Sequence, residues 1–168
     1  MQPTLLTLIV TTYNWPEALE LVLLSIKKQL ILPDEVIIAD DGSTIATQDM
    51  ISQYQRNFPV PLIHSWQEDQ GFRLARSRNQ AIAKAKGDYI VMIDGDMILQ
   101  RNFIQDHKRI AKPHQFVQGR RVILTENISQ DAVTNKNICF SFFSSEVKNK
   151  INSLHCPLLS PIISTLFS

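Results

Sequence analysis

The stretch TLIVTTYNWPEALELVLLSI, residues 7–26, followed by EVIIADDGS, residues 35–43, decides the fold of this chain. The short apolar run Leu5–Thr11 predicts a buried strand, and the residues after it have the apolar spacing of a helix. A second apolar run, Glu35–Ala39, predicts the next strand. Strand, helix and strand in this order are typical of a βαβ unit, so we expect parallel strands.

The rest of the chain continues this alternation. Asn14 can cap the first helix and Gly87 can end the third one. The further elements that we expect are a helix from Ser43 or Thr44 to about Asn57, a strand at Val60–Trp66, a helix at Leu74–Lys86, a strand at Tyr89–Ile93, a helix at Phe103–Ala111 and a fifth strand at Phe116–Leu124. Beyond Thr125 the periodicity fades. The sequence predicts an α/β domain with a mostly parallel, Rossmann-like sheet flanked by helices.

Composition narrows the classes of partner. The chain has 168 residues, 44% of them hydrophobic, and 17 Lys and Arg against 16 Asp and Glu leave a net charge of +1. Such a balance predicts no nucleic-acid partner. The N-terminus lacks the cationic region of a signal peptide, and two cysteines, Cys139 and Cys156, are too few for a disulfide scaffold. We therefore expect a cytoplasmic protein, with a peripheral position at the cytoplasmic face of the inner membrane left open.

Polar motifs fall where the predicted strands end. Thr11-Thr12-Tyr13-Asn14 follows the first strand, Asp40-Asp41 the second, Gln67-Glu68-Asp69 the third and Asp94-Gly95-Asp96 the fourth. Because ligands of parallel sheets bind at the carboxyl ends of the strands, these motifs predict one acidic, ligand-binding edge.

The segment Asp94-Gly95-Asp96 is the candidate metal site. In extended backbone the two carboxylates point the same way, and Gly95 would let a ligand approach the chain closely. Paired carboxylates suit Mg²⁺ or Mn²⁺ and leave coordination positions for a diphosphate. The tripeptide alone would favour a simple polar turn, but its place directly after an apolar strand favours the metal site.

Other polar residues have two interpretations. Asp40 can accept a hydrogen bond from a base or ribose, whereas Asp41 and Ser43 are expected to build the turn and cap the next helix. Arginines near the start of the Ala-rich helix can meet phosphate, although helical spacing keeps all three from facing inward. These arginines are Arg73, Arg76 and Arg78. The aromatic side chains Trp15 and Trp66 favour core or lid positions, and His64 and His107 favour structural or surface ones.

Taken together, TLIVTTYNWPEALELVLLSI, IIADDGS and QEDQGFRLARSRNQAIAKAKGDYIVMIDGDMI resemble the ordered motifs of the family 2 glycosyltransferases with a GT-A fold. The resemblance runs from about Leu5 to about Leu124. It is strongest to bacterial enzymes that build polysaccharide or lipopolysaccharide, including the chondroitin-polymerase-like subgroup. It implies an inverting enzyme that transfers a hexosyl or N-acetylhexosaminyl group from a UDP-sugar to a saccharide acceptor.

The resemblance also implies roles for individual residues. The donor-binding residues that it implies are Thr11, Tyr13, Asn14, Asp40, Arg78, Asn79, Asp94 and Asp96. Asp94-Gly95-Asp96 matches the family's DXD motif, in which Asp96 would bind Mn²⁺ or Mg²⁺ directly and Asp94 would reach the ribose or a metal-bound water. Transfer would require a general base that activates the acceptor while the metal stabilises the leaving nucleoside diphosphate.

The general base has no match in the sequence. Residues 1–125 match the nucleotide-sugar-binding core, and 126–168 look like the start of an incomplete acceptor-side region, so we expect a truncated chain that is inactive in transfer, with the base beyond Ser168. Glu126 and Asp131 are expected to be solvated or helix-capping acids. A non-catalytic nucleotide-sugar-binding module and a sugar nucleotidyltransferase stay as alternatives. The apolar tail 157–167 is too short to span a bilayer, which takes roughly 20 residues, and predicts self-association.

Overall fold

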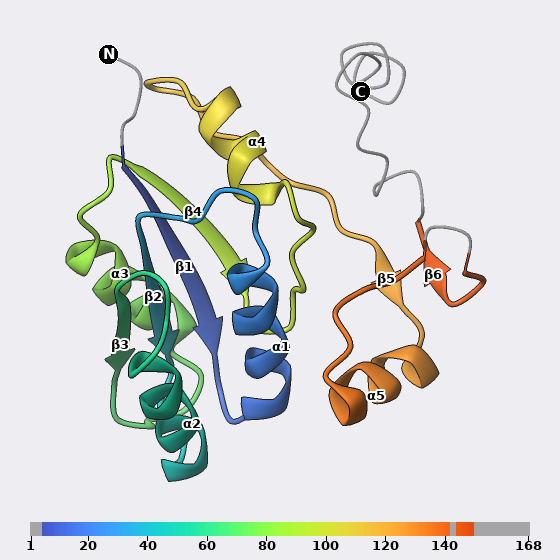
Figure 1. The fold of residues 1–168 in the computed structure, drawn as a ribbon. Helices are drawn as coiled ribbons and strands as arrows, with labels where there is room; N and C mark the ends of the chain where they lie inside the picture. The colour runs from blue at the N-terminus through green and yellow to red at the C-terminus, as the bar shows by residue number, and fades with distance from the viewer. Residues whose placement is uncertain (1–4, 142–143, 150–168) are drawn as a thin grey trace. The chain divides into compact units, whose positions relative to one another are not determined.

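The computed structural model describes residues 5–141 and 144–149, and its chain divides into two compact units, 1–115 and 116–168. The first unit alternates strands and helices (Figure 1). Its elements are β1 (Leu6–Thr12), α1 (Pro16–Lys27), β2 (Glu35–Asp40), α2 (Ile45–Gln55), β3 (Leu62–Trp66), α3 (Leu74–Lys84), β4 (Tyr89–Asp94) and α4 (Phe103–Ile110). This order confirms the α/β class that the sequence predicts.

The centre of the first unit is a four-stranded sheet in the order β3-β2-β1-β4, with all neighbouring strands parallel. Every residue of β1 and β2 is buried, as expected for strands that are covered on both faces. Because the strands are parallel, the loops that follow them emerge at one edge of the sheet.

The two faces of the sheet are covered by different helices. On one face, Leu8 and Val10 of β1 pack in a large core with α1, α2 and α4, which contribute side chains such as Leu23, Ile51 and Ile104. On the other face, a smaller core joins Ile9 of β1 to α3. Alternation along the strand thus sends successive side chains of β1 to opposite layers.

Three local predictions were wrong. The predicted fifth strand, Phe116–Leu124, does not extend the parallel sheet. Only Ile123–Leu124 forms a strand, β5, which pairs antiparallel with β6 (Val147–Lys148) in the second unit. Helix α3 was predicted to run to Lys86 and to end at Gly87, but it ends at Lys84 because Ala85 has an extended backbone (φ −65°, ψ 135°). The Gly87 amide instead donates to Thr7 Oγ1 (2.9 Å).

The third correction concerns Asn14, which does not cap α1. The residue before α1 is Trp15, and it makes no side-chain cap. Asn14 has a left-handed backbone (φ 48°), and its side-chain oxygen instead accepts a hydrogen bond from the Thr44 amide (2.8 Å) at the start of α2. It therefore caps the neighbouring helix.

The second unit contains α5 (Glu126–Asn135) besides β5 and β6. Glu126 opens this helix, and Asp131 accepts a hydrogen bond from Asn135 Nδ2 (2.7 Å). Both acids thus stand on a helix rather than in a loop. The assignment of residues 126–168 to an acceptor side stays a prediction.

The apolar tail 157–167 and Cys156 lie outside the described residues. Among the residues that the structure describes, no helix has the length and apolar character to cross a membrane.

Candidate functional site

The strand-end motifs of β1 to β4 lie at the same level of the sheet. In the strand register, Thr11 is the partner of Asp94, Thr12 is the partner of Asp40, and Asp40 is also the partner of Trp66. The four loops that follow these strands therefore start side by side, as the sequence predicts.

The β1 and β4 ends bring together three of the predicted donor-binding residues. Asp94 Oδ1 lies 3.0 Å from Arg78 Nη2 and 3.2 Å from Thr11 Oγ1. The Arg78 and Asp94 side chains are 35% and 47% exposed, so this ion pair is open to solvent and contributes little to stability. Arg73 and Arg76 are exposed and make no ion pair within the described part of the chain. One arginine of the three thus turns to the acidic edge.

Gly95 has a structural role that the sequence did not indicate. A Cβ atom at this position would lie 2.3 Å from the Thr11 carbonyl oxygen. The glycine therefore lets the β1 backbone lie close to the β4 loop. Its role in the approach of a ligand stays a prediction.

Two predicted residues stand free at this edge. Asp96 and Asn79 are exposed, and neither side chain makes a hydrogen bond or ion pair within residues 5–141 and 144–149. No group of three or more His, Cys, Asp or Glu side chains among the described residues is placed to hold a metal ion. The candidate metal ligands are the two carboxylates that the sequence predicts, those of Asp94 and Asp96. These hard oxygen donors fit Mg²⁺ or Mn²⁺ only with further oxygens from a ligand or water.

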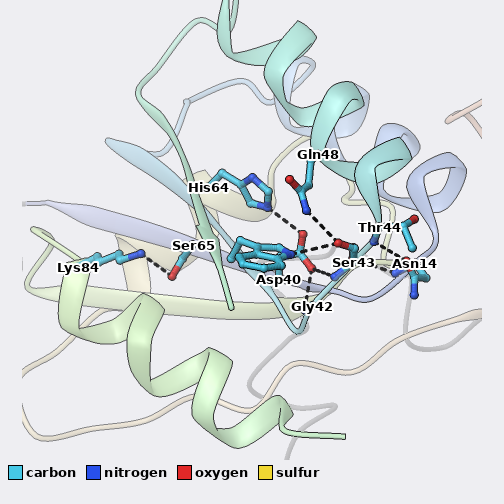
Figure 2. Close-up of polar contacts among 10 residues, drawn as sticks. Asn14, Asp40, Gly42, Ser43, Thr44, Gln48, His64, Ser65 and Lys84 are labelled. Carbon is cyan, nitrogen blue, oxygen red and sulfur yellow. Dashed lines mark hydrogen bonds and ion pairs between the residues drawn. The ribbon is translucent and has the colours of Figure 1, made fainter. Parts of the chain in front are cut away.

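Asp40 is fully buried and both of its carboxylate oxygens are engaged (Figure 2). Oδ1 accepts hydrogen bonds from the amides of Gly42 (3.2 Å) and Ser43 (2.8 Å), and Oδ2 lies 2.8 Å from His64 Nε2. The sequence assigned the turn chemistry to the residues after Asp40, but Asp40 itself closes the turn. Its role in binding a base stays a prediction.

Ser43 is the centre of the network in Figure 2. Its hydroxyl accepts a hydrogen bond from the Asn14 amide (2.9 Å), and its carbonyl accepts from Gln48 Nε2 (3.0 Å) and Trp66 Nε1 (3.1 Å). Bonds from the loop after β1, from α2 and from the end of β3 thus converge on one turn residue in the loop after β2.

The loop after β3 folds over the loop after β2. The Asp41 carboxylate accepts hydrogen bonds from Gln67 Nε2 (2.5 Å) and the Arg73 amide (2.9 Å). Gly42 has a positive φ of 101°, and a Cβ there would lie 2.6 Å from the Asp69 Cα atom. Asp69 also accepts a hydrogen bond from the Tyr13 hydroxyl (3.0 Å), and that bond, with the negative charge of Asp69, raises the pKa of Tyr13.

Sequence reasoning did not foresee the partners of two residues that shape this edge, His64 and Gln67, although Gln67 belongs to the motif predicted at the end of the third strand. His64 was expected to be structural or at the surface, and its pairing with Asp40 was not foreseen. A signal was present: His64 precedes the end of β3 by two residues, and strand side chains alternate, so it shares a face with Trp66 and hence with Asp40. Gln67 carried no comparable signal, because it acts from a loop.

Two solved structures similar to this chain hold nucleotide sugars. They are S. aureus TarS 1-349 in complex with UDP-GlcNAc and the mannosyltransferase PcManGT from Pyrobaculum calidifontis in complex with GDP-Man and Mn2+. The first is 25% identical with a TM-score of 0.54 over 63% of this chain and 30% of its own. The second is 27% identical with a TM-score of 0.55 over 67% of this chain and 34% of its own. The fold is that of a GT-A glycosyltransferase domain.

The family follows from the sequence comparison. The glycosyl transferase family 2 model matches residues 7–164, and the chain belongs to this family. Similar relatives are a hyaluronan synthase of Pasteurella multocida, 37% identical over 87% of this chain, and a chondroitin synthase of Escherichia coli, 24% identical over 78% of it. The chain spans only 15% and 20% of the length of these two relatives.

Proposed function

We propose that the first unit is the donor-binding domain of an inverting glycosyltransferase that takes its sugar from a UDP-sugar. The acceptor that we propose is a polysaccharide or lipopolysaccharide, and the group transferred is a hexosyl or N-acetylhexosaminyl group. The observation that carries this proposal is the grouping of Asp94, Thr11 and Arg78 at the carboxyl ends of β4 and β1, with Asp96 free beside it.

Arg78 gives this edge a way to receive a diphosphate. Its guanidinium is held at the carboxyl end of β4 by a partly exposed ion pair with Asp94. Its Nε atom is buried and has no hydrogen-bond partner among the described residues. A guanidinium forms strong, charge-assisted hydrogen bonds to phosphate oxygens. Arg78 can therefore contact a phosphate and keep the Asp94 carboxylate in place.

We propose that Asp96, together with Asp94, holds Mn²⁺ or Mg²⁺. A bound divalent cation would neutralise the charge that builds up on the departing nucleoside diphosphate. Asp96 supports this assignment because it is exposed and has no competing protein partner in the described ranges, whereas Asp94 Oδ1 is already engaged by Arg78 and Thr11.

Titration calorimetry with UDP, with and without Mn²⁺, tests the proposal. Asp96→Ala should abolish the enhancement of UDP binding by Mn²⁺, and Asp49→Ala, which removes an exposed acid from α2, should preserve it. Arg78→Ala should weaken UDP binding by about 1.5–3 kcal/mol, the range for hydrogen bonds to charged groups. Its melting temperature should barely change, because an exposed ion pair contributes only about 0–1 kcal/mol. Equal enhancement by Mn²⁺ in Asp96→Ala and parent would refute the metal site.

A non-catalytic nucleotide-sugar-binding module is the second candidate, and it is favoured by the engagement of Asp131 within α5. Incubation with UDP-sugars, Mn²⁺ and oligosaccharide acceptors distinguishes the two. Multiple turnovers of elongated product, detected by mass spectrometry, would exclude the binding module.

A further inference from the structure

The amino ends of the sheet strands carry a surface that is both basic and apolar. It is formed by residues 27–34, which join α1 to β2, and by residues 99–112, which include α4 (Figure 1). The two segments are bonded together: the Leu30 amide donates to the Arg101 carbonyl (3.0 Å), and Gln29 Oε1 accepts from the Ile104 amide (3.1 Å). We call this surface the amino-end surface.

Charge is concentrated on the amino-end surface. Its cations are Lys27, Lys28, Arg101, Lys108, Arg109 and Lys112, and its acids are Asp34 and Asp106. Six cations minus two acids give a net charge of +4, against +1 for the whole chain. Lys108 pairs with Asp34 (2.8 Å), while the other five cations are exposed and make no ion pair within the described residues. The positive charge is therefore not neutralised locally.

Large apolar side chains stand among these cations. Leu30, Ile31 and Ile110 are 52%, 40% and 39% exposed. A soluble polyanion needs only the cations, whereas the interface of an anionic bilayer attracts cations to its headgroups and takes up apolar side chains below them. Exposed cations combined with exposed apolar side chains therefore favour an anionic bilayer, rather than a dissolved anionic polymer, as the binding partner.

We propose that the amino-end surface docks the protein peripherally on a membrane that contains anionic lipids. The orientation that follows leaves the candidate donor site accessible, because that site lies at the carboxyl ends of the same strands, at the opposite end of the sheet. A docked molecule can thus exchange a water-soluble nucleotide sugar while it stays on the membrane.

Vesicle flotation with the 168-residue chain tests this docking. The protein should float with phosphatidylcholine vesicles that contain about 30% phosphatidylglycerol and not with pure phosphatidylcholine, and raising NaCl from about 0.05 to 0.3 M should release it. Neutralising two cations in Arg101→Gln/Arg109→Gln should weaken binding about 25-fold, at about fivefold per charge. The matched control Arg120→Gln/Lys148→Gln, which removes two exposed cations of the second unit, should bind like the parent.

The apolar side chains separate a bilayer from a general polyanion. Leu30→Ser/Ile31→Ser should lose vesicle binding at least tenfold while its melting temperature stays close to the parent's, because both side chains are exposed. To compare the bilayer with a general polyanion, the same binding measurement is repeated with dextran sulfate in place of the vesicles. The proposal is overturned if the parent does not float with anionic vesicles at low salt, or if Leu30→Ser/Ile31→Ser floats like the parent. It is also overturned if Arg120→Gln/Lys148→Gln weakens binding as much as Arg101→Gln/Arg109→Gln does.

Discussion

Replacing Asp40 by alanine should destabilise the first unit strongly. The carboxylate is fully buried and holds the amides of Gly42 and Ser43 through Oδ1 and His64 through Oδ2. Asp40→Ala leaves all three partners without an acceptor inside the protein. Because Ser43 also anchors the Asn14 amide, the loss spreads to the loop after β1.

The size of the effect follows from the number of bonds lost. A buried donor left unsatisfied costs about 1–3 kcal/mol, so two amides and one imidazole give about 3–5 kcal/mol when water reaches part of the opened turn. Asp40→Asn keeps one oxygen for the two amides and should cost about 1–2 kcal/mol. Domains of this size are stable by about 5–15 kcal/mol, so the alanine variant should lose about a fifth or more of the total.

Urea denaturation followed by circular dichroism measures these differences. The control is Asp49→Ala, which removes an exposed carboxylate from α2 and should change the free energy of unfolding by less than about 0.5 kcal/mol. If Asp40→Ala unfolds within about 1 kcal/mol of the parent, then Asp40 does not hold the turn and the reasoning from buried donors fails here.

Two further predictions concern packing and pH. Gly95→Ala should cost about 1–3 kcal/mol in urea denaturation, because its Cβ would meet the Thr11 carbonyl oxygen at 2.3 Å, and Gly119→Ala, whose Cβ has no neighbour within 4 Å, should not. Burial lowers the pKa of His107, whose Nδ1 lies 3.1 Å from the Tyr89 hydroxyl. Since the unfolded chain then takes up a proton more readily than the folded one, stability should fall as the pH drops through about 6.5. Thermal melts at about pH 7.5 and 5.5 should show a smaller difference in His107→Gln than in the parent; an equal difference would count against the buried imidazole.

The sheet was predictable because its signal is local and repeated. Apolar runs such as Leu5–Thr11 and Glu35–Ala39 are short and bounded by turn residues, and the structure places β1 and β2 within one residue of them. The prediction of a strand at Phe116–Leu124 was wrong because it rested on the same local signal. An apolar pattern reports burial within a segment, but it does not say which strand, if any, will pair with that segment.

The details of the turns were not predictable in this way. Asp40 and Asp41 are neighbours with the same side chain, and nothing local distinguishes the one that closes its own turn from the one that binds the next loop. Asn14 was expected to cap the helix that follows it and caps α2 instead. Asp41 and Asn14 have partners on a different strand-end loop, so their assignment depends on the tertiary arrangement.

Burial divides the strand-end residues into two groups with different consequences for binding. Asp40 and Asp41 are buried, and their carboxylate oxygens accept hydrogen bonds from backbone amides and from side chains at neighbouring strand ends. A ligand could therefore bind either carboxylate only by displacing a bond that holds the loops together. Asp94 is partly exposed and Asp96 is exposed, and the charged partner of Asp94 is an arginine, whose guanidinium can also bind phosphate. Under the proposed function, a nucleoside diphosphate would therefore bind at the end of β4, where it displaces the fewest bonds between loops. The buried pair would support that binding indirectly, because it keeps the loops after β1, β2 and β3 in fixed positions.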